Sequence, residues 1–159
     1  MINLNKLNLI LIFLFLSNCV ATSQKPKCVI DAMSKFYENY NSNAHRANHT
    51  LADEASSALE DARMKISNFF GANPENMIYT SGATEAINLV SYGWAKYNLE
   101  KGDVIVITEM EHHANIVPWQ MLATERGVVL RVVPIDDRGN FQMDAFEQLL
   151  NPKTKLVSV

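Results

Sequence analysis

The sequence predicts an α/β fold, with a parallel-rich sheet flanked by helices, from three observations. Short β-rich runs alternate with helical stretches in the second half of the chain, which is typical of strands joined by crossover helices. The run Val104–Ile107 is apolar at every position, as expected for a strand buried on both faces. A chain of 159 residues, 48% of them hydrophobic, is long enough for one α/β core, so we expect one compact unit.

The first segment of the chain has the shape of a signal peptide. A basic residue precedes the apolar run Leu9–Leu16, and the small residues Ser17 and Ala21 follow it. Eight apolar residues are too few for a permanent membrane span, which needs about 20 in helical form. An atypical start in front of a soluble domain explains the run equally well. We therefore divide the chain into an apolar leader or atypical start, residues 1–20, and one domain over residues 21–159.

Two amphipathic helices are predicted next. Apolar residues recur at steps of three and four between Pro26 and Tyr40, and Pro26 suits a first helical turn. Thr50 and Asp53 form a capping-box signature at the start of the second helix, and Gly71 ends it. The apolar face of this second helix is predicted to comprise Leu51, Ala55, Ala58, Leu59, Ala62, Ile66 and Phe69.

Four strands separated by helical stretches are predicted in the rest of the chain. The strands are expected at Met77–Thr80, Val104–Ile107, Val128–Val133 and Lys155–Val159. The helix after the first strand is predicted to have an apolar face that includes Ala86, Val90, Trp94 and Tyr97. The last run reaches the final residue without a turn, cap or polar tail, so we expect a domain truncated at Val159.

Composition argues against two kinds of partner. The 14 basic and 17 acidic residues are scattered along the chain and give a net charge of -3, so no nucleic-acid partner is expected. Cys19 and Cys28 lack the paired spacing of a zinc site, and we expect no metal.

The first candidate site is the junction Tyr79–Ala86, where a predicted strand leads through Gly82 into a helix. Backbone N–H groups of Ala83 and Thr84 lie at the helix N-terminus, where the helix dipole favours a phosphate, and the Thr84 hydroxyl adds a donor. Strand, glycine and helix often follow one another without binding anything, so the motif by itself leaves both interpretations open.

The second candidate site is Thr108–Asn115, just past the carboxyl end of a buried strand, where ligands bind in open α/β sheets. The imidazole of His112 has the chemistry to stack on a flat cofactor, transfer a proton, or bind a metal together with Glu111. Adjacent side chains on a strand point to opposite sides, so we do not expect His112 and His113 to chelate one ion. The alternative is a pair of loop histidines bonded to the backbone.

The third candidate site is the polar loop Asn43–Thr50, which contains His45 and His49. Its composition favours a solvated connector between two helices.

These three loops occur together and in this order in one enzyme family. The sequence resembles the SufS-like group II cysteine desulfurases of the class V aminotransferase family, which use pyridoxal 5'-phosphate (PLP). The stretch Glu111–Gln120, which reads Glu-His-His-Ala-Asn-Ile-Val-Pro-Trp-Gln, is long and unusual and carries most of the resemblance. Shorter matches are His45-Arg46, His49-Thr50-Leu51, Gly82-Ala83-Thr84-Glu85 and Ile87-Asn88-Leu89-Val90. The resemblance covers about residues 21–159 and corresponds to the N-terminal portion of a family member.

The resemblance implies a fold, a cofactor and site residues. The fold is the PLP-dependent transferase fold type I (aspartate aminotransferase-like), of which the chain is a partial large domain. Ala83 and Thr84 are expected to hold the PLP phosphate. His112 is expected to stack over the pyridine ring as a catalytic residue, and His45 to lie on the substrate side.

The resemblance also implies a reaction and its partners. Cysteine desulfurases convert L-cysteine to L-alanine and pass the sulfur, as an enzyme persulfide, to an acceptor protein for iron–sulfur cluster assembly. Family members are homodimers of the cytoplasm or of organelles. The Schiff-base lysine and the nucleophilic cysteine follow Val159 in family order, so we expect this chain to be an incomplete and inactive fragment. The alternatives are a related class V PLP enzyme, such as a selenocysteine lyase, and a non-catalytic truncated remnant.

Overall fold

The computed structural model describes residues 24–46 and 48–159, so the predicted leader, residues 1–20, lies outside the described residues. The described chain divides into two compact units that meet in sequence between Tyr79 and Thr80. The expectation of one unit is therefore wrong. Both buried apolar clusters of the described residues lie in the second unit and consist of residues from Ile87 onward.

The first unit contains the two predicted helices. Helix α2 (Lys27–Asn39) follows Pro26 as predicted, and none of its residues is buried. Its apolar residues Val29, Ile30 and Met33 are all exposed. None of the helices in the described part of the chain is long and apolar enough to cross a membrane.

Helix α3 (Thr50–Phe70) begins and ends where the sequence predicted, but the capping residue differs. His49, not Thr50, is the N-cap, and its Nδ1 accepts a hydrogen bond from the Ala52 N–H at 3.3 Å. Thr50 is already helical, whereas His49 has the extended backbone that a cap needs. The predicted apolar face is only partly correct, since the buried residues of α3 are Ala52, Ala55 and Ser67.

The segment Met77–Thr80, predicted as a strand, follows the short helix η2 (Pro74–Asn76) but has no regular secondary structure and pairs with no strand among the described residues. The carbonyl oxygen of Met77, which a neighbouring strand would otherwise bind, accepts a hydrogen bond from Arg63 Nη1 at 2.6 Å. The same guanidinium lies over the Tyr79 ring, 4.8 Å from its centroid.

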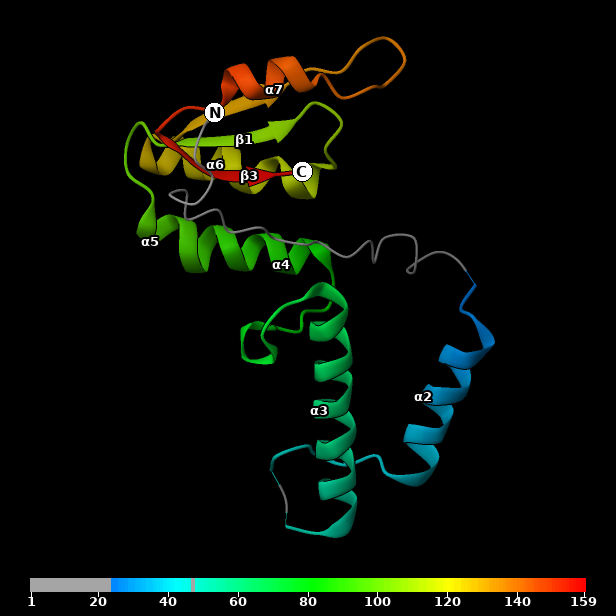
Figure 1. The fold of residues 1–159 in the computed structure, drawn as a ribbon. Coiled ribbons are helices and arrows are strands. Elements are labelled where there is room, and N and C mark those ends of the chain that lie inside the picture. The colour runs from blue at the N-terminus through cyan, green and yellow to red at the C-terminus, as the bar shows by residue number, and fades with distance from the viewer. Residues whose placement is uncertain (1–23, 47) are drawn as a thin grey trace. The chain divides into compact units, whose positions relative to one another are not determined.

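The second unit contains the predicted parallel sheet. Strands β1 (Val104–Thr108), β2 (Val129–Val133) and β3 (Thr154–Ser158) pair in the order β2-β1-β3, and both pairs are parallel (Figure 1). Ile105 on the central strand pairs with Leu130 and Leu156 on its two neighbours. All five residues of β1 are buried, which confirms the prediction from its unbroken apolar run.

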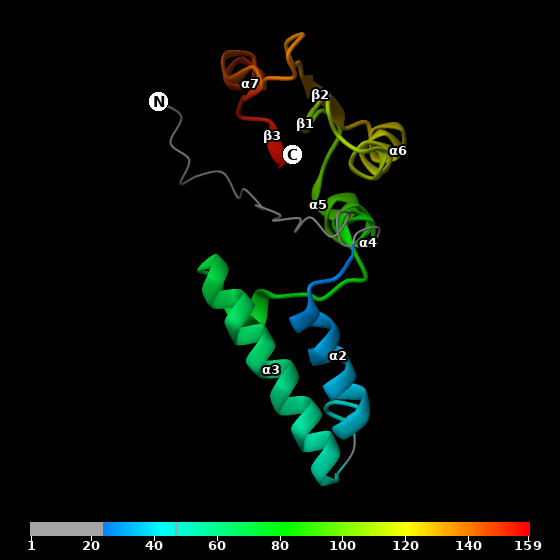
Figure 2. The ribbon, with the colours of Figure 1, turned by 90° about the vertical axis from the view of Figure 1, so that its right-hand side faces the viewer.

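Helices cover both faces of this sheet (Figures 1 and 2). Helix α6 packs on the same face as the long helical segment before β1, and α7 packs on the opposite face. The helical elements are α4 (Ala83–Leu89), the π-helical η3 (Val90–Ala95), α5 (Lys96–Asn98), η4 (His113–Asn115), α6 (Val117–Arg126) and α7 (Met143–Leu149).

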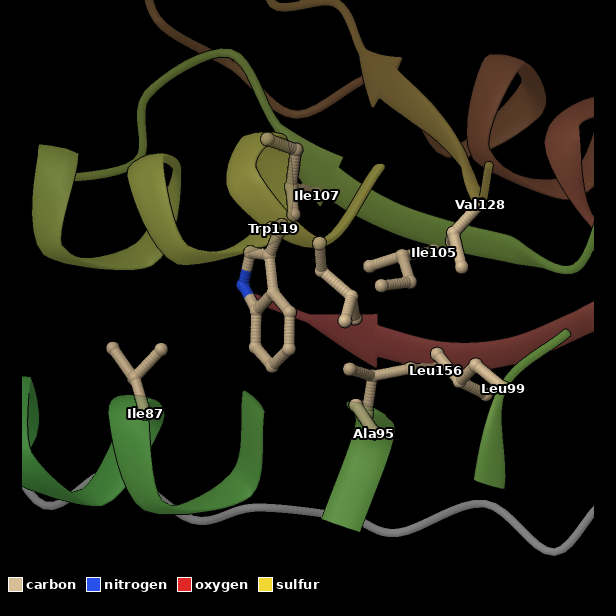
Figure 3. Close-up of a cluster of buried hydrophobic side chains, with 9 residues drawn as sticks. Ile87, Ala95, Leu99, Ile105, Ile107, Trp119, Val128 and Leu156 are labelled. Carbon is tan, nitrogen blue, oxygen red and sulfur yellow. The ribbon is translucent and has the colours of Figure 1, made fainter. Parts of the chain in front are cut away.

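The central strand divides the core into two clusters. Ile105 and Ile107 point to the α4 and α6 side, where Trp119 and Leu156 complete a dry cluster (Figure 3). Alternate residues of β1 point to the α7 side, as a strand period of two requires. That second cluster comprises Val104, Val106 and Val133, with Phe146, Leu149, Leu150 and Val157 packed against it.

The helical segment before β1 buries a different stripe from the one predicted. Val90 and Trp94 pack against the core as expected, but Tyr97 is 76% exposed, so that prediction is wrong. The stretch η3 is π-helical and has more residues per turn than an α-helix. Residues at steps of four therefore stay on one face along this segment, whereas in a regular α-helix they would gradually turn away from it. The buried positions accordingly fall at Ile87, Ser91, Ala95 and Leu99.

Candidate functional site

Two of the three predicted loops meet at one edge of the sheet. Helix α4 starts at Ala83 and the loop carrying His112 leaves the carboxyl end of β1, and Figure 1 shows both at the same end of the sheet unit. The elements α4 and η4 contact each other there. The carboxyl edge of a parallel sheet is where ligands bind in open α/β folds. This juxtaposition is the candidate site.

The first turn of α4 supplies donors and a favourable dipole. Gly82 is the N-cap and makes no side-chain capping bond, and Thr84 is exposed in this turn. The N-terminal amides of a helix attract anions. Glu85 bends back to Ser81, whose N–H and Oγ–H both donate to Glu85 Oε2 at 2.6 Å. The carboxylate of Glu85 thereby orients the turn that precedes the helix.

The contact with Ser81 lowers the pKa of Glu85 below its ordinary value of 4.5, chiefly through the Ser81 hydroxyl and then through the backbone N–H. Because the folded-state pKa is the lower one, this contact stabilises the fold above the ordinary pKa and is lost as the pH falls through the lowered pKa. We expect the Glu85 carboxyl carbon, followed by NMR, to titrate below 4.5, and closer to 4.5 in Ser81→Ala.

Ser57→Ala provides the control for this titration, because Ser57 is an exposed serine of α3. It should leave the Glu85 titration unchanged. An unchanged titration in Ser81→Ala as well would show that the hydroxyl does not hold the carboxylate.

His112 is oriented by a bond to the backbone. It is the N-cap of η4, and its Nδ1 accepts a hydrogen bond from the Ala114 N–H at 3.1 Å. Nδ1 therefore carries no proton, and the neutral ring holds its proton on Nε2. The alternative prediction was a pair of loop histidines bonded to the backbone, and His112 has such a bond. That bond uses a lone pair in the ring plane, so the bond itself covers neither ring face, although the neighbouring His113 ring lies 4.2 Å away between centroids. His112 is exposed.

His113 does not lie opposite His112, so the prediction that the two rings point to opposite sides is wrong. Their centroids are 4.2 Å apart and the rings are inclined by 30°. The strand ends at Thr108, and η4 begins at His113, so the alternation of a strand does not apply to this pair. Within residues 24–46 and 48–159, no group of three or more His, Cys, Asp or Glu side chains is arranged to hold a metal ion.

A hydrogen-bonded network beneath His112 was not predicted from the sequence. Asn115 is 4% exposed and is the centre of this network. Its Oδ1 accepts hydrogen bonds from Trp119 Nε1 at 2.9 Å and from Ser158 Oγ at 2.5 Å. Its Nδ2 donates to Glu111 Oε2 at 2.7 Å.

The network ties three elements together at the sheet edge. The other carboxylate oxygen of Glu111 accepts a hydrogen bond from Thr108 Oγ1 at 2.5 Å. Thr108 and Ser158 are the last residues of β1 and β3. The four-residue spacing of Glu111, Asn115 and Trp119 was the available signal, but it does not reveal the bond to Ser158.

His45 belongs to the helical unit, whereas Ala83, Thr84 and His112 belong to the sheet unit. It has a positive φ of 59°, an uncommon conformation for a residue with a side chain. Its N–H donates to Ser56 Oγ at 2.9 Å, and its Nε2 lies 3.2 Å from Glu60 Oε1. These contacts hold His45 against α3.

Comparison with known proteins identifies the family. The family model for aminotransferase class-V matches residues 14–159. The chain is 53% identical over 139 residues to a probable cysteine desulfurase 1 of Mycobacterium leprae, covering 87% of this chain and 23% of that protein. It is 47% identical over 140 residues to a probable cysteine desulfurase of Vibrio cholerae, covering 87% of this chain and 35% of that protein.

A solved structure agrees with the sequence comparison. The apo structure of a cysteine desulfurase from Thermococcus onnurineus NA1 superposes with a TM-score of 0.79 and 35% sequence identity. That match covers 96% of this chain and 36% of the other. The chain thus spans between about a fifth and about a third of the length of the curated relatives that it matches. The sheet unit is part of the PLP-dependent transferase fold that the sequence predicted, and the chain belongs to the class-V aminotransferase family, whose members use PLP.

Proposed function

We propose that this chain forms one side of the PLP site of a SufS-type cysteine desulfurase. One observation carries the proposal: the start of α4 and the His112 loop lie at the same carboxyl edge of the sheet, and α4 contacts η4. An anion site and an oriented aromatic ring are thereby adjacent, as a phosphorylated, flat cofactor requires.

The residues present fit this cofactor. The amides and the Thr84 hydroxyl at the start of α4 are donors suited to a phosphate group. His112 offers an exposed ring whose orientation is fixed by the Ala114 N–H. When bound, PLP supplies an electron sink for breaking bonds next to an amino-acid nitrogen.

Each residue then has a distinct task. Ala83 and Thr84 bind the phosphate through the first turn of α4. His112 lies over the pyridine ring, and its Nε2–H can donate a hydrogen bond or a proton. His45 serves the substrate side, held in its loop by Ser56 and Glu60.

The substrate and partners proposed for the whole protein follow from its relatives. These relatives are named as probable cysteine desulfurases, so L-cysteine is the proposed substrate. Transfer of the sulfur to an acceptor protein for iron–sulfur assembly, and a homodimer as the working form, are proposed from the resemblance to the SufS-like family. The chain spans only part of these relatives. We propose that the 159-residue chain by itself binds the cofactor without catalysing desulfuration, because none of its lysines matches the family's cofactor lysine.

PLP binding to the purified protein tests the proposal, and ³¹P NMR of the PLP phosphate measures it. Thr84→Val removes one hydroxyl donor and should weaken binding about tenfold, the scale of one hydrogen bond to a charged group. His112→Ala removes the stacking ring and should weaken binding by a factor of roughly 2 to 10, as expected for one aromatic contact.

Thr124→Val and Tyr97→Ala are the matched controls. Thr124 donates to the Gln120 carbonyl within α6, and Tyr97 is an aromatic residue that is 76% exposed. Both controls should leave PLP affinity within a factor of about two, as surface substitutions do. Equal losses in each site variant and its control, or no binding by the unaltered protein, would contradict the proposal.

A further inference from the structure

We propose that Asn115 is a positioning residue for His112. Its buried amide is the centre of a hydrogen-bonded network that connects the ends of β1 and β3 to the loop residues before and after His112. What the imidazole then does rests on the proposed function. The positioning itself rests only on bonds within this chain, and its test needs no cofactor.

The amide of Asn115 has one orientation that satisfies its surroundings. Its Oδ1 receives two hydrogen bonds, from the indole N–H of Trp119 and from the Ser158 hydroxyl. Its Nδ2 faces the carboxylate of Glu111. A flipped amide would place its NH₂ against the indole donor and its oxygen against the carboxylate, leaving buried donors and acceptors unpaired.

The network fixes the backbone before and after His112. On the preceding side, Glu111 is held at one oxygen by Thr108 and at the other by Asn115. On the following side, Asn115 is the last residue of η4, and its N–H donates to the His112 carbonyl oxygen at 2.7 Å. His112 therefore lies between two anchored residues. The Ala114 N–H that bonds to its Nδ1 belongs to the same anchored turn.

Packing alone does not require this arrangement. An apolar core residue would fill the space, and exchanging a whole buried polar set for apolar groups is often neutral or stabilising. Directional bonds from Asn115 reach the end of β3, 43 positions away in sequence, the indole of α6, and the carboxylate before His112. These directional bonds fix the orientation of the loop that carries His112. The imidazole needs a fixed orientation, whereas an apolar core does not.

The variant Asn115→Asp tests the proposal with almost no change in shape. An aspartate keeps the oxygen that accepts from Trp119 and Ser158, but it places a second carboxyl oxygen 2.7 Å from Glu111 Oε2. Two carboxylates at that distance repel each other, so the contact between positions 111 and 115 is kept only while one of the two carboxyl groups holds a proton. At neutral pH, above the pKa of that proton, the contact is lost. We expect His112 to lose its single Nε2–H tautomer at neutral pH, seen by ¹⁵N NMR as a shift of the Nδ1 resonance toward the two-tautomer average.

Acid should restore the stability that the Asn115→Asp variant loses at neutral pH. The shared proton raises the carboxyl pKa of the folded variant above the ordinary value of about 4. Stability is therefore complete below the ordinary pKa and is lost as the pH rises through the raised one. Loss of packing would show no such acid rescue. Asn98→Asp, the same change at an exposed residue whose amide donates only to the Trp94 carbonyl, should leave the His112 resonances unchanged.

A double variant in which the amide and the carboxylate exchange places, called the reversed pair, distinguishes a positioning role of Asn115 from a general loss of stability. In Glu111→Gln combined with Asn115→Asp, the glutamine NH₂ donates to the aspartate, while Thr108, Trp119 and Ser158 keep acceptors. The double variant should restore the single His112 tautomer at neutral pH. Its PLP affinity should return to within a factor of about two of the unaltered protein, after a loss of about tenfold in Asn115→Asp alone.

The outcomes are distinct. A reversed pair that does not fold, or that folds with His112 in a tautomer mixture, would overturn the positioning role. The same holds if Asn115→Asp keeps the Nε2–H tautomer at neutral pH. If the tautomer changes as expected while the unaltered protein binds no PLP, the positioning stands and the proposed function fails.

Discussion

Replacing Trp119 with alanine is expected to lower the free energy of unfolding of the sheet unit by about 3 to 5 kcal/mol. The indole is fully buried and belongs to the cluster shown in Figure 3, where it lies with Ile87 of α4 and Ile107 of β1. Its removal leaves a cavity between helix and sheet. It also takes one of the two donors away from Asn115. Urea unfolding followed by circular dichroism measures the loss.

Two further variants separate the effects of volume and hydrogen bond. Trp119→Phe keeps most of the apolar volume but has no N–H, so it should cost about 1 to 2 kcal/mol. Gln120→Ala, at the next and exposed position of α6, should change stability by less than about 0.5 kcal/mol. A loss below about 1 kcal/mol in Trp119→Ala would mean that the cluster around the indole does not stabilise the sheet unit.

The central part of the fold could be predicted because local patterns determine it. The unbroken apolar run of β1 gave both the strand and its burial on two faces. The alternation of strand and helix gave the parallel sheet. Glycine after a run of helical residues located the end of α3, where Gly71 has a φ of 62°.

The predictions that failed depended on partners or on an irregular helix. Met77–Thr80 has strand composition, yet a strand needs a neighbour, and an arginine side chain bonds to Met77 instead. Tyr97 was assigned to the core by an α-helical period that the π-helical stretch before it does not follow. In each case the local sequence preference was assigned correctly, but the tertiary context determined the structure that the residues adopt.

The candidate site divides in the same way. The positions of Ala83, Thr84 and His112 at one sheet edge follow from placing two motifs at strand ends, and the structure brings these motifs together. The network beneath His112 depends on a bond between Asn115 and Ser158, which are 43 positions apart. No local pattern predicts such a contact. His45 stays a prediction, because it belongs to the other unit.

Leu156→Ala is the second large expected effect, a loss of about 2 to 5 kcal/mol in the free energy of unfolding. Leu156 is fully buried in the middle of β3 and packs in the same cluster as Ile105 and Trp119. Lys155→Ala is the matched control, because that neighbouring residue of β3 is exposed and its loss should cost less than about 0.5 kcal/mol.

The same pair of variants tests whether the core holds the site in place. Leu156 lies two residues before Ser158, whose hydroxyl bonds to Asn115. A cavity at Leu156 should loosen the end of β3, so amide hydrogen exchange at residues 111–119 should accelerate in Leu156→Ala and stay unchanged in Lys155→Ala. If Leu156→Ala is destabilised but exchange in that loop is unchanged, the His112 loop is held by α6 and β1 alone. The bond from β3 to Asn115 would then add nothing to its rigidity.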